Sequence, residues 1–144
     1  AYCGTGTIGL CAAAHVKHLT GVELNPDAVR DAKENARRNG VTNAEFYAGP
    51  CEKLLPQLAS EGLKFDAVVL DPPRKGCDEA VLRAAAQTNP ARIVYVSCNP
   101  ATLARDVARL RKLGYVLRKA RPFDMFSWTG EVETVALLER EKLD

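Results

Sequence analysis

The fold of this chain is decided by the stretch RIVYVSCNP at residues 92–100. Its apolar, β-branched first half is typical of a buried strand, and Asn99-Pro100 ends that strand because the residue before a proline is restricted. Cys98 therefore lies where a strand ends and the next element begins. Ligands bind at this edge of open α/β sheets, so the thiol is a candidate nucleophile. The alternative is a small buried hydrophobe, which most free cysteines are.

Strand-like and helix-like segments alternate outward from this stretch, which predicts an α/β fold with a mostly parallel sheet covered by helices. The expected strands are 19–24, 43–47, 65–70, 91–97, 114–121 and 131–139. The expected helices are 7–18, 26–39, 51–60, 78–88 and 100–112. The loop between the last two strands is too short for a parallel crossover, so we expect the final strand to be antiparallel to its neighbour.

The composition limits the class of protein. With 144 residues, 47% of them hydrophobic and 26% charged, the chain is expected to form one domain over residues 1–144. We see no apolar stretch of membrane-spanning length and no secretory signal. The five cysteines are odd in number and form no Cys-x-x-Cys pair, which argues against a disulfide framework or a metal site and favours a reducing, cytoplasmic compartment. The formal charge of +2 is too weak to indicate nucleic-acid binding by itself.

The first residues, Ala1-Tyr2-Cys3, run directly into a glycine-rich turn of the kind that follows a full strand. We therefore expect most of the first strand, and whatever precedes it, to lie outside this chain. The turn is GTGTIG at residues 4–9 and fits the pattern G-x-G-x-x-G. Glycines such as Gly4 and Gly6 let the backbone turn tightly and approach a ligand.

Two acidic residues extend this cofactor-like pattern. Glu23 ends the next strand, 14 residues after Gly9, where a carboxylate can accept hydrogen bonds from both hydroxyls of a ribose. NAD and S-adenosylmethionine both carry such a ribose, so Glu23 leaves the two cofactors open. The segment DPPR at residues 71–74 favours S-adenosylmethionine over NAD, because a hydride-transfer enzyme has no need of this segment. Its prolines form a stiff wall at the sheet edge, and Asp71 is expected to face the same crevice as Glu23 and Cys98.

Four segments resemble signatures of the RNA uridine-5-methyltransferases, which use S-adenosyl-L-methionine to make 5-methyluridine in tRNA or ribosomal RNA. They are YCGTGT (2–7), DPPRKG (71–76), IVYVSCNPAT (93–102) and FDMFSWTGEVE (123–133). The resemblance covers essentially the whole chain. It implies a Rossmann-like class I methyltransferase sheet with an antiparallel strand near the C-terminus, S-adenosyl-L-methionine as cofactor and structured RNA as partner. It implies no metal, membrane or obligate protein partner, and it places an RNA-binding region upstream of this chain.

The family's functional residues fall on particular positions of this chain. The resemblance assigns the nucleophile to Cys98 and the proton-abstracting base to Glu133. The family's cofactor contacts fall on Tyr2, Thr7, Glu23 and Asp71. Three positions depart from the family's pattern, which has a polar residue near the adenine, a proline in the loop and a histidine two residues before the base; here they are Pro50, Ser127 and Glu131.

Methylation of uracil at carbon 5 requires a thiol and a base, because that carbon is a poor nucleophile. Addition of a thiolate to carbon 6 creates an enolate that can take the methyl group at carbon 5. A base must then remove the carbon-5 proton before the thiolate can leave. Cys98 and Glu133 supply this minimum set.

Three further residues are candidates for holding the substrate. Phe126 and Trp128 lie in the loop before the base, where they either receive a uracil extruded from its stack or pack in the core. Arg74 either contacts a phosphate or the uracil, or pairs with a neighbouring acid. Two other functions stay open: a methyltransferase that acts on nitrogen or on a small molecule without using Cys98, and a non-enzymatic RNA-binding module.

Overall fold

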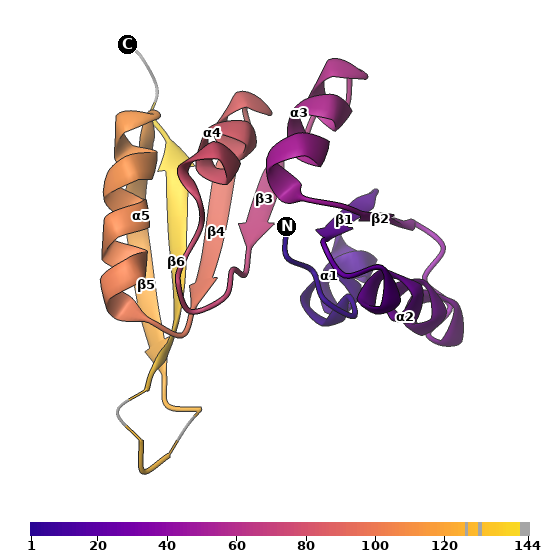
Figure 1. Ribbon diagram of the computed structural model, residues 1–144, viewed down its shortest axis with the longest axis horizontal. Coiled ribbons are helices and arrows are strands. Elements are labelled where there is room, and N and C mark those ends of the chain that lie inside the picture. Colours follow the sequence, from indigo (N-terminus) through magenta and orange to yellow (C-terminus); the bar gives the residue numbers. More distant parts are fainter. Residues whose placement is uncertain (126, 130, 142–144) are drawn as a thin grey trace. The chain divides into compact units, whose positions relative to one another are not determined.

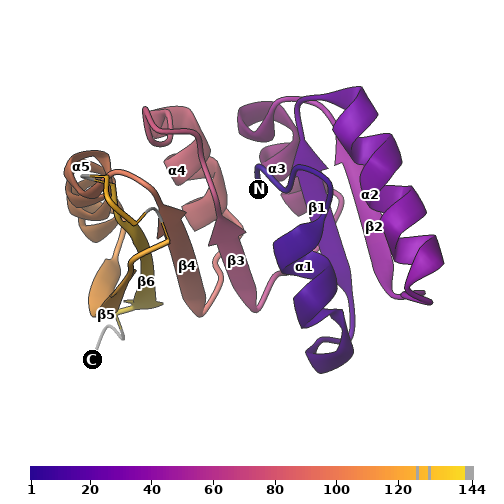
Figure 2. The ribbon, with the colours of Figure 1, turned by 90° about the horizontal axis from the view of Figure 1, so that it is seen from below.

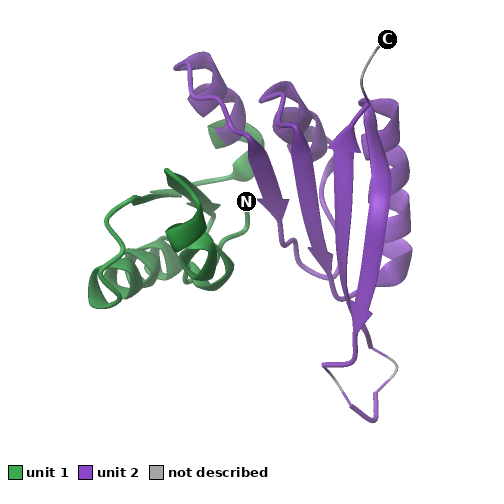
Figure 3. Ribbon diagram, turned by 180° about the vertical axis from the view of Figure 1, so that it is seen from behind, with its two compact units in different colours: residues 1–54 green, residues 55–144 purple. Residues whose placement is uncertain are grey.

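The computed structural model describes residues 1–125, 127–129 and 131–141. Phe126, one of the candidates for holding the substrate, lies outside the described residues. The chain divides into two compact units, residues 1–54 (unit 1) and 55–144 (unit 2), which Figure 3 shows in different colours. Each unit has its own sheet, so each is described by itself. The expectation of a single domain over residues 1–144 stays a prediction.

Unit 1 contains a two-stranded parallel sheet and the helices around it. Its elements are α1 (Thr7–Ala12), the 3₁₀-helix η1 (Ala13–His15), β1 (Leu19–Glu23), α2 (Pro26–Arg38), β2 (Ala44–Ala48) and the first part of α3 (Cys51–Ser60). Asn25 caps α2 as its sequence predicts, because its side chain accepts a hydrogen bond from the Asp27 amide at 2.9 Å. The core of the unit joins α2 to β2 through Val29, Ala32, Ala36 and Phe46.

The predicted helix over 7–18 is wrong in its second half. The α-helix ends at Ala12, a single 3₁₀ turn follows, and the backbone is already extended at Val16. The side chain of Asn43 donates to the carbonyl oxygens of Ala13 and Val16, both at 2.9 Å. A side chain from a distant part of the sequence thus satisfies carbonyl groups that a longer helix would have used, and the chain can enter β1 directly.

Unit 2 contains a four-stranded mixed sheet in the order β3-β4-β6-β5. Its complete elements are β3 (Ala67–Leu70), α4 (Glu79–Gln87), β4 (Arg92–Ser97), α5 (Pro100–Lys112), β5 (Tyr115–Phe123) and β6 (Glu133–Arg140). β3 and β4 are parallel, whereas β6 is antiparallel to both β4 and β5. Figures 1 and 2 show α4 and α5 on the same face of this sheet. The predicted antiparallel final strand is confirmed, and it lies between β4 and β5.

The core of unit 2 lies under α4 and α5. Residues along β4 alternate between exposed or partly exposed and buried positions, and Ile93 and Tyr95 are fully buried. Ala136 and Leu138 on β6 and Leu110 on α5 are fully buried as well. This period of two is expected for a strand with one face against helices. No helix among the described residues is long and apolar enough to cross a membrane.

We predict that Gly21→Ala destabilises unit 1 through a clash in its core. A Cβ atom at Gly21 would lie 2.4 Å from the ring of Phe46 and 3.0 Å from the Cys3 sulfur. Overpacking of this kind lowers the free energy of unfolding by about 1–3 kcal/mol. Chemical denaturation of the two proteins measures the difference.

Phe46→Leu provides the control for this clash. The smaller side chain removes the ring edge, so Gly21→Ala should be less costly in the Phe46→Leu background than in the natural one. An equal cost in the two backgrounds would contradict the clash as the cause.

Candidate active site

Cys98 lies between the last residue of β4 and the first turn of α5. The hydroxyl of Ser97 donates to the Asn99 carbonyl at 3.0 Å and accepts from the Asn99 amide at 3.1 Å. The Asn99 side chain caps α5, accepting from the amides of Ala101 at 3.0 Å and Thr102 at 3.4 Å. The backbone is therefore fixed on both sides of a partly exposed thiol.

The strand register brings Glu133 to the same end of the sheet as Cys98. β4 and β6 pair in antiparallel fashion up to Ser97 and Thr134. Cys98 follows Ser97, and Glu133, the first residue of β6, precedes Thr134, so the same register continued by one step would set the two opposite each other. Residues directly opposite one another in such a pair have Cβ atoms about 4.5–5.5 Å apart. The residues assigned as nucleophile and base, distant in sequence, thus share one end of the sheet.

A second carboxylate lies close enough to Glu133 to affect its ionisation. Asp71 follows the last residue of β3, and burial raises its pKa above the ordinary value. Burial also raises the pKa of Glu133, and the negative charge of Asp71 raises it further. A carboxylate with a raised pKa is a stronger base than an ordinary glutamate, as a group that removes a proton requires.

Arg74 pairs with an acid, which is one of the two roles expected for it. Its guanidinium forms a hydrogen-bonded ion pair with the carboxylate of Glu131, two residues before Glu133. The Arg74 side chain is largely exposed. Exposed ion pairs contribute little to stability, so an anionic ligand can exchange with Glu131. A contact between Arg74 and substrate stays a prediction.

Trp128 does not pack in the core. Its side chain is fully exposed in a turn after β5, and its φ of 70° is uncommon for a bulky residue. Core packing, one of its two expected roles, is therefore wrong for Trp128. An exposed aromatic ring is available for stacking on a base.

The glycine-rich turn of unit 1 is held by Glu23. The Gly4 amide donates to Oε2 of Glu23 at 2.9 Å, and the Asn25 amide donates to Oε1 at 2.9 Å. Gly4 and Gly6 have φ angles of 52° and 86°, in the region that favours glycine. Each carboxylate oxygen retains a further lone pair, so Glu23 can still accept from a ribose. Sequence reasoning predicted a cofactor contact for Glu23, which stays a prediction, and missed its role in shaping the turn.

Sequence reasoning also missed a buried carboxylate on α5. Leu103, Asp106 and Leu110 are buried on the same helix, at a spacing that places them on its core-facing side. A charged residue within such an apolar stripe was the available signal. Among the described residues, no group of three or more His, Cys, Asp or Glu side chains is arranged to hold a metal ion.

Comparison with known proteins connects these features to a family. The profile described as tRNA (uracil-5-)-methyltransferase matches residues 1–141. An uncharacterized RNA methyltransferase of Halalkalibacterium halodurans is 52% identical over 139 residues, which are 96% of this chain and 30% of that relative. One of Lactobacillus johnsonii is 51% identical over 140 residues, 97% of this chain and 31% of that relative. The chain thus spans about a third of the length of these relatives.

Solved structures give the same fold. The crystal structure of Pyrococcus abyssi tRNA (uracil-54, C5)-methyltransferase in complex with S-adenosyl-L-homocysteine has a TM-score of 0.81 and 35% identity, covering 95% of this chain and 32% of that one. NSun6 from Pyrococcus horikoshii has a TM-score of 0.79 and 19% identity, covering 97% and 46%. The second likeness shows the Rossmann-like class I fold alone.

We predict that Glu133 titrates above the ordinary glutamate value of 4.5, because of burial and the charge of Asp71. Asp71→Asn should move its pKa back toward 4.5, as measured by NMR of the side-chain carboxyl. A carboxyl group whose pKa is higher in the folded than in the unfolded protein contributes its full stability at pH values below the unfolded pKa. This contribution is lost as the pH rises through the folded pKa. Glu133→Gln should therefore unfold less readily than the natural protein at neutral pH, and the difference should shrink in acid.

Glu131→Gln is the control for this titration. Glu131 is paired with Arg74 and is not among the groups that raise the pKa of Glu133, so its change should shift the titration less than Asp71→Asn does. A Glu133 pKa at or below 4.5 in the natural protein would contradict the prediction.

Proposed function

This chain belongs to the tRNA (uracil-5-)-methyltransferase family, and from that membership we propose that it transfers a methyl group from S-adenosyl-L-methionine to carbon 5 of a uridine in tRNA or ribosomal RNA. One structural observation supports the proposal in addition to family membership. The register of β4 and β6 brings a thiol and a carboxylate together at one end of the sheet. These are the two groups that the reaction at carbon 5 requires.

The mechanism assigns one step to each group. S-adenosyl-L-methionine, when bound, supplies a methyl group on a positively charged sulfur. The Cys98 thiolate forms a bond to carbon 6 of uracil, and the electrons of the carbon 5–carbon 6 double bond move toward the carbon-4 oxygen. Carbon 5 uses that electron density to take the methyl group, and the electron pair of the broken sulfur–methyl bond stays with the leaving S-adenosyl-L-homocysteine. Glu133 then accepts the carbon-5 proton, the double bond re-forms, and Cys98 leaves as a thiolate.

The residues of unit 1 fit the adenosyl end of this cofactor. Gly4 and Gly6 hold a tight turn without side chains, and a Cβ added at Gly4 would meet no atom within 4 Å. Glu23 adds a carboxylate with lone pairs for ribose hydroxyls. The resemblance assigns further contacts to Tyr2, Thr7 and, in unit 2, Asp71. These assignments rest on the resemblance alone.

The substrate contacts are proposed from exposure and charge. Arg74 offers a largely exposed guanidinium in an ion pair with Glu131, which suits exchange with a phosphate or a uracil carbonyl. Trp128 offers an exposed ring for stacking on an extruded base. Phe126 keeps the same proposed role from its sequence position.

The proposal is tested with RNA that contains 5-fluorouridine. Its fluorine cannot be removed as a proton, so the reaction should stop at a covalent protein–RNA adduct after methyl transfer. We expect the full-length protein to form this adduct with S-adenosyl-L-methionine and a substrate tRNA or ribosomal RNA, as seen by a gel shift under denaturing conditions. Cys98→Ala should reduce adduct and 5-methyluridine below detection.

Glu133→Gln and Glu131→Gln form a matched pair for the base. Glu133→Gln should trap a similar adduct on natural RNA, because the carbon-5 proton stays in place, whereas Glu131→Gln should not. The opposite result would reassign the base. Methylation that persists in Cys98→Ala would favour a methyltransferase that acts on nitrogen or on a small molecule.

We predict that Glu23→Gln weakens binding of S-adenosyl-L-methionine by about tenfold or more. The substitution removes a charged acceptor and turns an NH₂ group toward a backbone amide, and hydrogen bonds to charged groups contribute about 1.5–3 kcal/mol. Isothermal titration calorimetry gives the dissociation constant. Glu45→Gln on β2 is the control, because that exposed carboxylate instead accepts a hydrogen bond from the hydroxyl of Tyr47. Equal affinities for the two variants would remove Glu23 from the cofactor site.

A further inference from the structure

Asp106 is a fully buried carboxylate on α5, and the proposed reaction does not use it. Burial of a charge is unfavourable unless the charge is paired and hydrogen-bonded. Four of the described residues donate to this one, and Arg105 does so twice, because its Nη2 also reaches Oδ2 at 3.3 Å. Oδ2 accepts from the hydroxyl of Tyr95 at 2.7 Å and the amide of Cys77 at 2.8 Å, and Oδ1 accepts from Nε of Arg105 at 2.9 Å and Nη1 of Arg109 at 3.2 Å.

These contacts keep Asp106 ionised. Burial alone would raise its pKa, but the hydrogen bonds from Arg105, Tyr95 and the Cys77 amide hold the pKa below the ordinary aspartate value. Burial also raises the pKa of Tyr95, so its hydroxyl stays a donor. The charge of Asp106 is therefore permanent at neutral pH, and its acceptor geometry is fixed.

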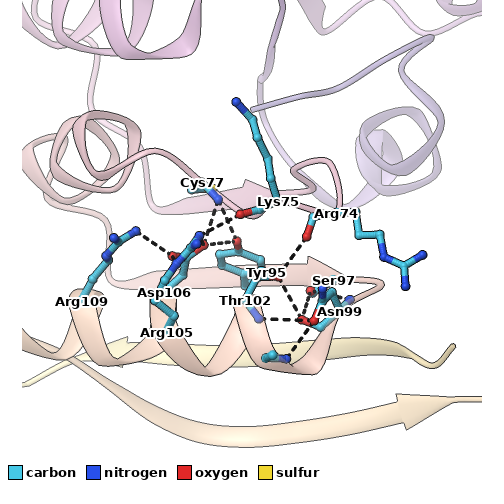
Figure 4. Close-up of polar contacts among 11 residues, drawn as sticks. Arg74, Lys75, Cys77, Tyr95, Ser97, Asn99, Thr102, Arg105, Asp106 and Arg109 are labelled. Carbon is cyan, nitrogen blue, oxygen red and sulfur yellow. Dashed lines mark hydrogen bonds and ion pairs between the residues drawn. The ribbon is translucent and has the colours of Figure 1, made fainter. Parts of the chain in front are cut away.

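The residues of α5 around Asp106 also hold the loop that follows β3. Nη2 of Arg105 donates to the Lys75 carbonyl at 2.9 Å, and the hydroxyl of Thr102 donates to the Arg74 carbonyl at 3.2 Å. Together with the Cys77 amide on Asp106, these bonds tie the backbone of residues 74–77 to α5 (Figure 4). Gly76 makes the close approach possible, because it has a φ of 77° and a Cβ there would lie 2.5 Å from Oδ2 of Asp106.

The two elements joined in this way lie next to the proposed site residues in the chain. α5 begins immediately after Cys98, and its cap fixes the backbone on the C-terminal side of the thiol. The loop carries Arg74, whose guanidinium reaches Glu131, two residues before Glu133. A shift of the loop relative to α5 would therefore move Arg74 relative to the thiol and the base.

We propose that Asp106 and Arg105 are positioning residues for uridine methylation, holding residues 74–77 against the helix that follows the nucleophile. This inference rests on the proposed function, and it explains how Arg74, the proposed substrate-binding arginine, is held in place. Neither residue contacts the reacting atoms. Small misplacements of a positioned group reduce reaction rates by up to about a hundredfold.

Arg105→Gln and Arg109→Gln form the matched pair that tests the proposal. Each removes one guanidinium from Asp106, but only Arg105 also reaches the loop backbone. The full-length variants are compared at a temperature where thermal melts and binding of S-adenosyl-L-methionine show both to be folded. We expect Arg105→Gln to lower kcat, and the rate of adduct formation on 5-fluorouridine RNA, by about tenfold to a hundredfold, with the KM for S-adenosyl-L-methionine unchanged.

Arg109→Gln should change both rates by less than about twofold, and Arg105→Lys, which keeps a charged donor beside Asp106, should recover part of the rate. Amide hydrogen exchange adds a readout that does not depend on activity: the Cys77 amide should exchange faster in Arg105→Gln than in Arg109→Gln. Equal kcat in the two folded glutamine variants overturns the positioning role and leaves the proposed function intact. Failure of the natural protein to form an adduct or 5-methyluridine overturns both.

Discussion

The antiparallel pairing of β6 with β4 is the constraint on which the candidate active site depends. Ser97 and Thr134 form the last pair of this ladder, and Cys98 and Glu133 are the next residue on each strand. Side chains alternate between the faces of a strand, and a slip of one residue would carry the carboxylate to the opposite face from the thiol. The buried residues of β6, Ala136 and Leu138, oppose such a slip because it would move them out of the core. The hydrophobic core of unit 2 thereby holds the register between β4 and β6.

Electrostatics then distinguish the groups at this end of the sheet. Glu133 and Asp71 are partly buried, and each is easier to protonate than an exposed carboxylate. Glu131, only two residues from Glu133, is instead paired with Arg74. The neighbouring glutamates therefore have different environments, one suited to accepting a proton and the other to holding a cation. The family's usual histidine at position 131 is replaced here by a carboxylate, and the ion pair with Arg74 gives that carboxylate a partner.

The glycine-rich turn of unit 1 and the loop 74–77 of unit 2 are held in the same way, by a carboxylate that accepts a backbone amide. In unit 1 the carboxylate of Glu23 accepts the Gly4 amide, and in unit 2 the carboxylate of Asp106 accepts the Cys77 amide. Glycines with positive φ shape both loops, Gly4 and Gly6 in the first and Gly76 in the second, and at Gly76 the missing side chain also lets the backbone approach the carboxylate. An ionised acceptor makes a stronger hydrogen bond to a backbone amide than a neutral one does. Loops fixed in this way present their side chains or backbone to a ligand with little loss of conformational entropy on binding.

The amino-acid sequence by itself determined the order and type of the elements, because hydrophobic periodicity and Asn-Pro caps are local. Helices 51–60 and 100–112 have the predicted bounds, and the strand that ends before Cys98 does as well within one residue. The sequence also nominated Cys98, Glu23 and Asp71 as site residues from their positions at strand ends, and Glu133 through resemblance; their roles stay predictions. Only the tertiary structure decided that β6 lies between β4 and β5, that Asn43 ends the first helix early, and that Trp128 is exposed. It also decided that a buried Asp106 holds the loop beside Arg74. These features depend on contacts between residues far apart in the chain, and no local pattern encodes which distant partner a strand, an amide or a carboxylate will meet.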